Sequence, residues 1–488
     1  MAQEEKGKEV PTVTYAVKAG WEGAPKTIEV KAAEGDLKPW DLDSKLRVVM
    51  GRQTRLEGPL KVTGRAKYTY DIALPGMLWG RMVGAAVPAA EITRIDTSRA
   101  EKLPGVKAVW TTESRTVRFA GQDVAAVAAV SPEVAEDASR LIEITYEEKP
   151  SVADLERAMA TEAPLVYEED KVPADKNVPR RGNILGPTGG RRSAGRGDVE
   201  KGFLEAAVSV EQTYRVPVHT HSPLETHGVI AHWEGDQLTV YASTQGIFTV
   251  REGVAEALGI DRKNVRVICE HMGGGFGSKL APSATGSAFA IVACKLAKQA
   301  GAPVKLMLDR RQEHLCTGNA PSALVTVRLG ATREGALAAV HYRSFGSAGI
   351  ATGAGTAGPV NALYTNCPNL KVEEHDVFTN AGPAAPLRAP GHSQGAFALE
   401  SAMDELAERL GMDPLELRRK NESSPVRLMQ YDVGAKAIGW ERRNRKAGEG
   451  SGTRKRGIGM ANGNWYVFAR GSGVGAQVKV HRDGSVEL

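Results

Sequence analysis

The sequence contains few cysteines, and no two of them are close enough to form a paired motif. Its four cysteines are Cys269, Cys294, Cys316 and Cys367, in a chain of 488 residues. A CxxC zinc or redox pair and a ferredoxin-type run of cysteines both need much shorter spacings. Any iron–sulfur centre that works with this protein is therefore expected on another chain.

Long apolar runs are also missing. No stretch of about 18 uncharged apolar residues occurs, and the first residues, Met1 to Glu9, are charged. The sequence therefore predicts neither a membrane span nor a secretory signal. A cytoplasmic location is expected, and a periplasmic one would require a signal on a partner subunit.

The sequence also lacks a strong excess of positive or negative charge. The net charge is only +5, and aromatic residues make up 6% of the chain. The densest basic segments, 180–192 and 442–456, are glycine-rich and carry no interleaved aromatic residues. A nucleic-acid-binding face should pair basic with stacking residues, so no nucleic-acid partner is predicted.

Length and periodicity predict an α+β protein of several domains. At about 150 residues per domain, the length indicates roughly three domains. Between residues 147 and 200 the sequence is rich in proline, glycine and charged residues and shows little hydrophobic periodicity, which favours a linker there. The predicted organisation is an N-terminal extension (1–45), a small α/β domain (46–150), a linker (151–200), a larger mixed domain (201–454) and the start of another β unit (455–488).

Hydrophobic patterns predict the individual elements. Strands are expected at 13–33 (short and β-like), 77–87, 106–111, 142–146, 207–215, 238–243, 265–269, 323–329, 338–345, 457–460 and 476–480. Helices are expected at 132–141, 250–258, 285–299 and 394–410, the first with Ser131 as N-cap. A polar, basic connector is expected at 421–453, and Arg482 to Ser485 is typical of a hairpin turn.

The strongest local signal is the segment Gly273-Gly274-Gly275-Phe276-Gly277-Ser278-Lys279. It lies between a predicted strand and a predicted helix, where glycines let backbone N–H groups approach an anion or a bulky cofactor. The spacing fits neither a nucleotide P-loop nor a dinucleotide-binding fingerprint. An anion-binding loop of another kind, or a plain turn, remains open.

Two further glycine and histidine patterns have an ordinary interpretation. The GxGxxG of Gly353, Gly355 and Gly358 is followed by Pro359 and lacks a βαβ context, so a flexible loop is predicted. His219, His221, Glu225 and His227 have ligand-like spacing, but a proline interrupts the segment and no HExxH helix is present. A polar strand and turn is favoured there over a zinc site.

Two polar side chains lie at positions where binding and catalytic sites often occur. Gln245 follows the predicted strand 238–243, and Arg388 lies in a proline-fixed loop before the predicted helix 394–410. Neither residue alone indicates a function.

In order and spacing, these segments resemble the xanthine dehydrogenase and aldehyde oxidase family. Gly51-Arg52, Val62 to Tyr68, Asp71, Leu74-Pro75-Gly76 and Leu103 to Val106 resemble its α/β hammerhead domain. Pro223-Leu224-Glu225, Thr244-Gln245-Gly246, Gly273 to Lys279, and Leu387 to Gly391 with the helix that follows resemble its molybdopterin-binding segments. The resemblance covers residues 46 to 488, and it implies a hammerhead domain, a first molybdopterin-binding domain and the start of a second.

The resemblance implies a cofactor site without direct protein ligands to the metal. Gln245 would hydrogen-bond the molybdenum centre, Phe276 would pack against it, and Arg388 would lie beside it to orient substrate or stabilise negative charge. The residues implied to bind the cofactor are Gln245, Gly246, Gly274, Gly275, Phe276, Gly277 and Arg388. Hydrogen-bond donors that glycine- and proline-containing loops hold in place can stabilise the charge that develops in a transition state.

The implied activity is hydroxylation with oxygen from water, driven by a molybdenum–molybdopterin cofactor in its cytosine dinucleotide form. Electrons would pass to [2Fe-2S] and FAD on partner subunits. Leu280 stands where purine-specific members carry an acidic residue, so aldehydes or aromatic N-heterocycles are expected rather than xanthine. The catalytic glutamate is expected beyond Leu488, and the chain alone is expected to be inactive.

Two alternatives remain open beside this oxidoreductase hypothesis. A protein with the family fold but no catalysis could act in binding or assembly. A zinc hydrolase built on the His219 to His227 segment is the other, and it is the less favoured.

Overall fold

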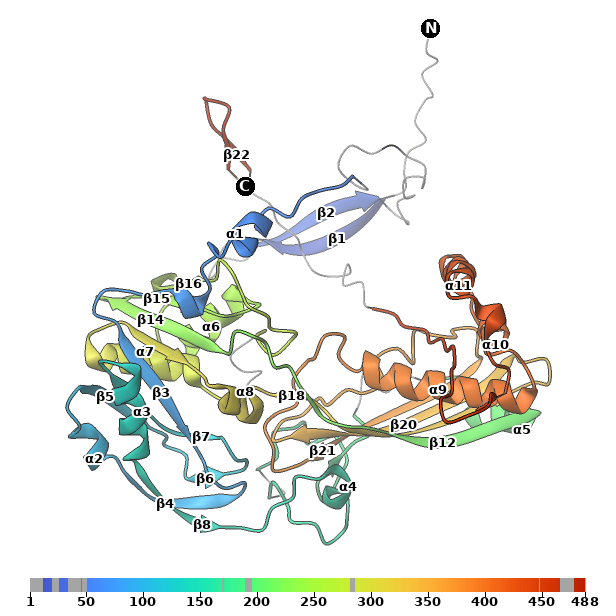
Figure 1. Ribbon diagram of the computed structural model, residues 1–488, viewed down its shortest axis with the longest axis horizontal. Coiled ribbons are helices and arrows are strands. Elements are labelled where there is room, and N and C mark those ends of the chain that lie inside the picture. The colour runs from blue at the N-terminus through green and yellow to red at the C-terminus, as the bar shows by residue number, and fades with distance from the viewer. Residues whose placement is uncertain are drawn as a thin grey trace. The chain divides into compact units, whose positions relative to one another are not determined.

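The computed structural model describes residues 12–19, 26–33, 45, 51–168, 171–188, 195–280, 286–446, 448–465 and 478–487. The chain divides into two compact units (Figure 1): Met1–Arg65 with Tyr466–Leu488, and Ala66–Trp465.

The smaller unit contains two separate antiparallel pairs of strands. β1 (Thr12–Ala19) pairs with β2 (Lys26–Ala33), which confirms the short β pattern expected at 13–33. Near the C-terminus, β22 (Lys479–Val480) pairs with β23 (Val486–Glu487). The turn between them is closed by the His481 N–H, which donates to the Ser485 carbonyl, and by the Gly484 N–H, which donates to the His481 carbonyl, as the sequence predicts. A short helix, α1 (Gly58–Val62), completes the unit.

The larger unit contains a seven-stranded sheet of order β16-β15-β14-β17-β3-β7-β5. Its strands are β3 (Leu78–Gly84), β5 (Val106–Thr111), β7 (Asp123–Ala129), β14 (Gly228–Glu234), β15 (Gln237–Ala242), β16 (Val265–Ile268) and β17 (Val304–Met307). β17 pairs in parallel with β3. The sheet therefore joins the predicted 46–150 domain to the next one, so that boundary does not separate two cores.

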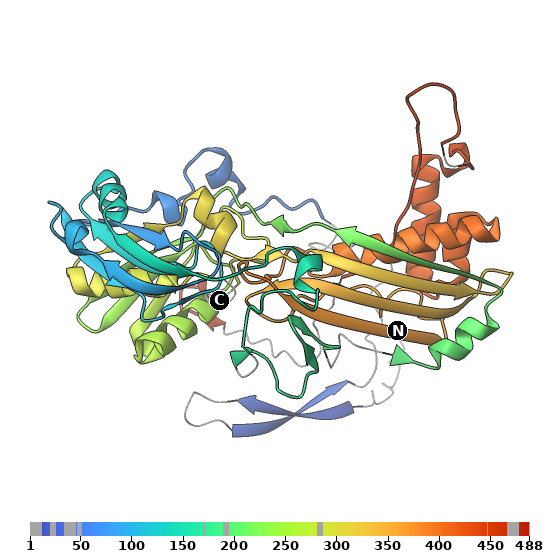
Figure 2. The same ribbon diagram turned by 90° about the horizontal axis from the view of Figure 1, so that it is seen from below.

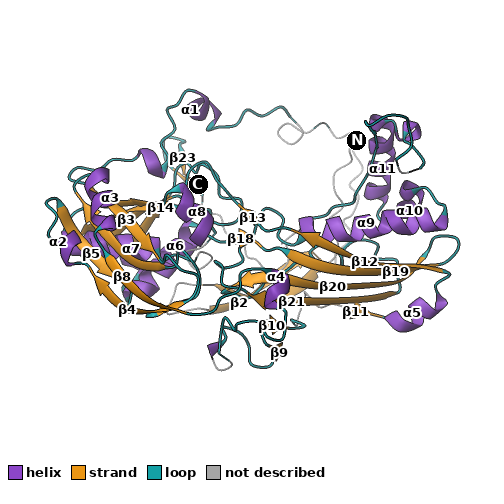
Figure 3. Cartoon of the chain, turned by 60° about the horizontal axis from the view of Figure 1, so that its bottom comes forward, coloured by secondary structure: helices purple, strands orange, loops and turns teal. Residues whose placement is uncertain are grey.

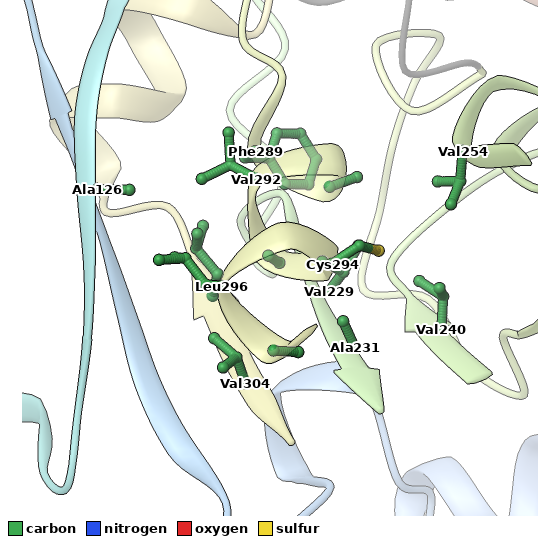
Figure 4. Packing of buried hydrophobic residues seen from close by; sticks show 14 of the residues in the cluster. Ala126, Val229, Ala231, Val240, Val254, Phe289, Val292, Cys294, Leu296 and Val304 are labelled. Carbon is green, nitrogen blue, oxygen red and sulfur yellow. The ribbon is translucent and has the colours of Figure 1, made fainter. Parts of the chain in front are cut away.

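Helices and a small sheet complete this part of the larger unit. α7 (Phe289–Ala300) packs on the large sheet and buries Phe289, Val292 and Leu296 against β14 and β17 (Figure 4). The other helices are α2 (Ser98–Glu101), α3 (Pro132–Arg140), α6 (Ile247–Leu258) and α8 (Arg310–Cys316). The small sheet has the order β6-β4-β8, with β4 (Ala90–Asp96), β6 (Thr116–Val117) and β8 (Glu143–Glu148). The Ser131 side chain accepts from the N–H of Val134, which confirms the predicted cap of α3.

A second seven-stranded sheet has the order β12-β19-β20-β21-β10-β9, with β11 also paired to β21 (Figure 2). Its long strands are β12 (Val208–Val216), β19 (Ala323–Ala331), β20 (Leu337–Gly349) and β21 (Asn369–Phe378). The helix α9 (His392–Leu410) packs on β12 and β19 and buries Leu399, Met403 and Leu406 (Figure 3). On β19, Val325, Val327 and Leu329 are fully buried, the period-2 pattern of a strand.

The structure corrects the predicted linker at 151–200. The segment contains α4 (Leu155–Ala158), α5 (Val199–Glu205) and the short strands β9 (Arg180–Arg181), β10 (Ile184–Leu185) and β11 (Gly195–Arg196). Val152, Leu155 and Tyr167 are buried in one cluster with Phe378 of β21. Isolated apolar residues pack here between irregular turns, so no periodic pattern marks the segment.

The C-terminal half requires two more corrections. The connector expected at 421–453 contains α11 (Pro425–Ile438), which Ser424 caps, and α10 (Pro414–Lys420) precedes it. Five apolar residues in α11 are spread around the helix rather than along one stripe, so periodicity misses it: Val426, Leu428, Met429, Val433 and Ile438. Residues 457–460 form no strand, because they pair with no neighbouring segment within the described part of the chain.

Candidate functional site

The candidate site gathers at one edge of the first large sheet. β15 and β16 are parallel neighbours, so their C-terminal ends lie together at the same edge. Gln245 follows β15, and the loop from Gly273 to Lys279, called the glycine loop below, follows β16. The topology therefore brings these two segments together although helix α6 separates them in the sequence.

Backbone hydrogen bonds from the glycine loop fix the side-chain amide of Gln245. Its Oε1 accepts from the N–H groups of Gly277 at 2.8 Å and Lys279 at 3.3 Å. In return, the N–H of Gln245 donates to the carbonyl of Lys279 at 2.7 Å. Because Oε1 is the acceptor, Nε2 is the donor that remains, and it bonds to no described residue.

The glycine loop needs glycine for conformation and for space. φ is +101° at Gly274 and +115° at Gly277, a region that side chains other than glycine rarely adopt. A Cβ on Gly275 would lie 2.6 Å from Oε1 of Gln245. Phe276 itself has φ +54° and is 43% exposed, so the loop holds a partly exposed aromatic residue in a strained conformation.

The loop that carries Arg388 contacts the glycine loop directly. The N–H of Arg388 donates to the carbonyl of Phe276 at 2.7 Å. Ala389 has φ +65°, and Gly391, with φ +74°, is the N-cap of α9. The Arg388 side chain is exposed, and its guanidinium pairs with no residue that the structure describes. The structure thus brings Gln245, Phe276 and Arg388 together.

Glu225 anchors the start of the glycine loop. Its Oε2 accepts from the N–H of Gly273 at 2.7 Å and from the hydroxyl of Ser243 at 2.8 Å. The Nζ of Lys279 donates to the Glu225 carbonyl and to Ser243 Oγ, both at 2.7 Å. Burial lowers the pKa of Lys279 to about 8, although the charge of Glu225 opposes that shift. Glu225 and Lys279 therefore hold the loop rather than face a substrate.

The loop offers backbone donors that no described residue accepts from. The N–H groups of Gly274, Gly275 and Phe276 bond to no described residue, although most backbone donors in a folded protein are paired. Consecutive free N–H groups in such a turn suit an anion. With the Nε2 of Gln245 and the guanidinium of Arg388, they make a donor set that fits an anionic cofactor held without protein ligands to its metal.

The other sequence patterns do not build a second site. His227 bonds Glu313, His221 bonds the Pro386 carbonyl, and His219 is exposed on the short strand β13 (His219–Thr220), which pairs with β18 (Asn319–Ala320). Across the described ranges, no group of three or more His, Cys, Asp or Glu side chains could hold a metal ion. These histidines thus have separate partners.

The GxGxxG segment is a loop, as predicted, but it binds carboxylates of its own chain. The N–H groups of Gly353 and Ala354 donate to Asp376, and those of Thr356 and Ala357 donate to Glu374. Both carboxylates lie on β21, so the loop is fixed to the second sheet.

Sequence reasoning missed Glu313, which is fully buried beside His227 at the back of the glycine loop. It lies in the first turn of α8, where a glutamate is ordinary, so its spacing gives no signal.

Among the described helices, none has the length and apolar character to cross a membrane.

Two family models match the chain. One described as the aldehyde oxidase and xanthine dehydrogenase a/b hammerhead domain matches residues 63–116, and one described as a molybdopterin cofactor-binding domain matches residues 183–422. The second match contains the glycine loop, Gln245 and Arg388. The fold and the site thus define a molybdopterin cofactor-binding protein.

Known relatives agree with that class. A probable xanthine dehydrogenase subunit of Bacillus subtilis is 31% identical over 89% of this chain and 60% of its own length. The aldehyde oxidoreductase molybdenum-binding subunit PaoC of Escherichia coli is 31% identical over 91% of this chain and 61% of its own. The solved structure of CO dehydrogenase from Oligotropha carboxidovorans matches with a TM-score of 0.70 at 26% identity, over 80% of this chain and 54% of that one.

The chain belongs to the xanthine dehydrogenase and aldehyde oxidase family. It spans about 60% of the length of these two curated relatives.

Proposed function

We propose that this chain is the molybdenum-cofactor subunit of a hydroxylase that oxidises aldehydes or aromatic N-heterocycles. In the overall reaction, a C–H bond becomes C–OH with oxygen from water, and two electrons and two protons are released. The electrons would pass to [2Fe-2S] and FAD centres on partner subunits in the cytoplasm. The observation that carries the proposal is the donor set of the glycine loop, Gln245 and Arg388.

When bound, the molybdopterin cofactor, proposed in its cytosine dinucleotide form, supplies the oxygen transfer and the two-electron chemistry. The chain's own residues supply position and charge. The free N–H groups of the glycine loop, with Gly246 beside Gln245, would hold the cofactor. Nε2 of Gln245 would donate a hydrogen bond to the bound cofactor, and Arg388 would orient the substrate and stabilise negative charge that develops on it.

Leu280 supports the proposed substrate class. It follows Lys279 directly, and the residue is 41% exposed. A leucine offers neither donor nor acceptor to a purine, and a site without such groups loses most of its discrimination for polar heterocycles.

The test is to purify the natural protein that contains this chain together with its partner subunits, measure molybdenum and pterin per chain, and assay turnover with an artificial electron acceptor. We expect stoichiometric molybdenum and faster oxidation of benzaldehyde than of xanthine. Faster oxidation of xanthine would overturn the substrate class. A stable complex without molybdenum would overturn the enzymatic proposal and favour the role in binding or assembly.

A further inference from the structure

The ring of His227 is enclosed by hydrogen-bond acceptors. His227 lies just before β14 and is 2% exposed. Its Nδ1 is 2.8 Å from Oε1 of Glu313, and its Nε2 is 3.1 Å from the carbonyl oxygen of Ser278 in the glycine loop. The backbone N–H of His227 donates to the other Glu313 oxygen at 2.8 Å. Each ring nitrogen therefore faces an oxygen.

This geometry constrains the protons. A neutral imidazole has one N–H donor and one lone pair, whereas an imidazolium has two donors. A carbonyl oxygen can only accept, so Nε2 must carry a proton. Nδ1 must then also carry one, unless Glu313 is the protonated partner. Burial raises the pKa of Glu313, but hydrogen bonds from the ring and backbone of His227, together with nearby positive charge, lower it, and the net pKa is lowered.

The surrounding charges agree with an ionised pair. Lys279 of the glycine loop also acts on Glu313, and its charge further favours the carboxylate. His221 also faces the pair. Burial lowers its pKa overall and favours the neutral form, although the hydrogen bond to the Pro386 carbonyl opposes that shift. The charge of Glu225, whose carbonyl accepts from Lys279, acts on Lys279 and favours its ammonium form.

The carbonyl that His227 contacts belongs to the same peptide unit as the N–H that Gln245 accepts. Ser278 C=O and Lys279 N–H lie in one planar trans peptide and point in opposite directions. On one side the carbonyl faces His227, and on the other the N–H donates to Gln245 Oε1. Fixing this plane from behind therefore fixes which end of the Gln245 amide faces the loop. Hydrogen bonds in such a series polarise one another.

We propose that His227 is a buried imidazolium, paired with the Glu313 carboxylate, which orients the Ser278–Lys279 peptide and through it the side-chain amide of Gln245. His227 is thus a positioning residue. The contribution of His227 to cofactor binding rests on the function proposed above. The protonation state of His227 and its effect on Gln245 do not depend on that function. Both can be measured without the cofactor.

The first measurement is the ring ¹⁵N spectrum of the histidine-labelled chain at neutral pH, in which His227→Gln identifies the signal. We expect both ring nitrogens of His227 to be of the protonated type. In Glu313→Gln, which keeps the volume but removes the charge, one nitrogen should change to the unprotonated type. The matched control is Glu373→Gln, which removes the half-buried partner of His341 and should leave His227 unchanged. One unprotonated nitrogen in the unmodified chain would overturn the proposal.

The second measurement follows the side-chain NH₂ signal of Gln245, identified with Gln245→Glu. We expect this signal to shift in Glu313→Gln. The side-chain NH₂ signal of Gln237 is the control and should not shift. Gln237 is the first residue of β15, and its side chain donates to Asn264. If the ring of His227 changes state and the Gln245 signal does not move, the positioning role is wrong. Molybdenum loading plays no part in either result, so failure here is distinct from failure of the proposed function.

Discussion

The backbone N–H of Arg388 donates to the carbonyl of Phe276 at 2.7 Å, which joins the loop before α9 to the glycine loop after β16. α9 packs on the second large sheet, and β16 belongs to the first. The two sheets therefore meet at the residues that the proposed cofactor needs. Small changes in that contact should affect the site before they affect either core.

Gly277→Ala should separate these two loops. A Cβ at Gly277 would overlap the carbonyl oxygen of Pro386, and φ there is +115°. We expect a loss of about 3 kcal/mol or more in the free energy of unfolding, because both backbones must shift. Urea unfolding measures it.

The control for that change is Gly259→Ala at the end of α6. Gly259 also has positive φ, +64°, but a Cβ added there would meet no atom within 4 Å. It should cost only about 1 kcal/mol, the cost of the conformation alone. Equal losses in the two variants would show that the contact with Pro386 contributes nothing.

Gln245→Glu tests the acceptor and the donor of the side-chain amide separately. A carboxylate can still accept from Gly277 and Lys279, so the melting temperature should change little. The donor Nε2 is lost, and removing one preorganised donor typically lowers kcat by about 100-fold or more. Turnover of the assembled enzyme should fall by that factor. Unchanged turnover would remove Gln245 from the proposed site.

Arg388→Met should leave stability unchanged. The guanidinium is exposed and has no partner among the described residues, and such surface changes are usually within about 0.5 kcal/mol. A loss of turnover without a loss of molybdenum would assign Arg388 to substrate rather than cofactor. Arg388→Lys, which keeps the charge but not the planar fork, shows whether two-point recognition matters.

The fold class was predictable from the sequence, and local signals also predict where the loops of the candidate site lie. Glycines, prolines and strand ends mark Gln245, the glycine loop and Arg388 locally, because loops of this geometry demand those residue types. Glu313 has no such mark, since its partner His227 lies far away in the sequence. The shared sheet of β17 and β3 was equally hidden, because parallel pairing across domains leaves no trace in local periodicity.

Arg418 provides a test of the second core. Its side chain is fully buried, with Nε 2.8 Å from Glu400 and Nη1 2.7 Å from Asp404. Arg418→Met would leave the Glu400 charge buried and unpaired, which typically costs about 3–5 kcal/mol. Arg419→Met, at a partly exposed ion pair with Asp432, should cost about 1 kcal/mol or less. Chemical denaturation compares them, and equal costs would contradict the burial argument.

Asp123 should make stability depend on pH in the direction opposite to most carboxylates. Burial raises its pKa to about 6, although the Ala288 N–H and the Ser287 hydroxyl donate to it at the start of α7. The unfolded pKa is about 3.9, so between about pH 4 and 6 the folded state binds more protons than the unfolded state. Stability from this group is therefore present below about pH 4 and is lost as the pH rises through about 6.

Replacing Asp123 by asparagine removes that titration, and the comparison with the unmodified chain isolates it from other groups. Two pKa units correspond to about 3 kcal/mol, so the variant should gain that much relative to the unmodified chain between about pH 4 and pH 7. Asp413→Asn should show the opposite trend. Burial raises the pKa of Asp413, but a hydrogen bond from Arg443 helps to lower it overall, so its stabilisation is lost toward acid pH. Urea midpoints between about pH 4 and 7 measure the trend for Asp123, and midpoints below about pH 4 measure the trend for Asp413. A flat difference for Asp123→Asn would mean that its carboxyl is not desolvated in the folded protein.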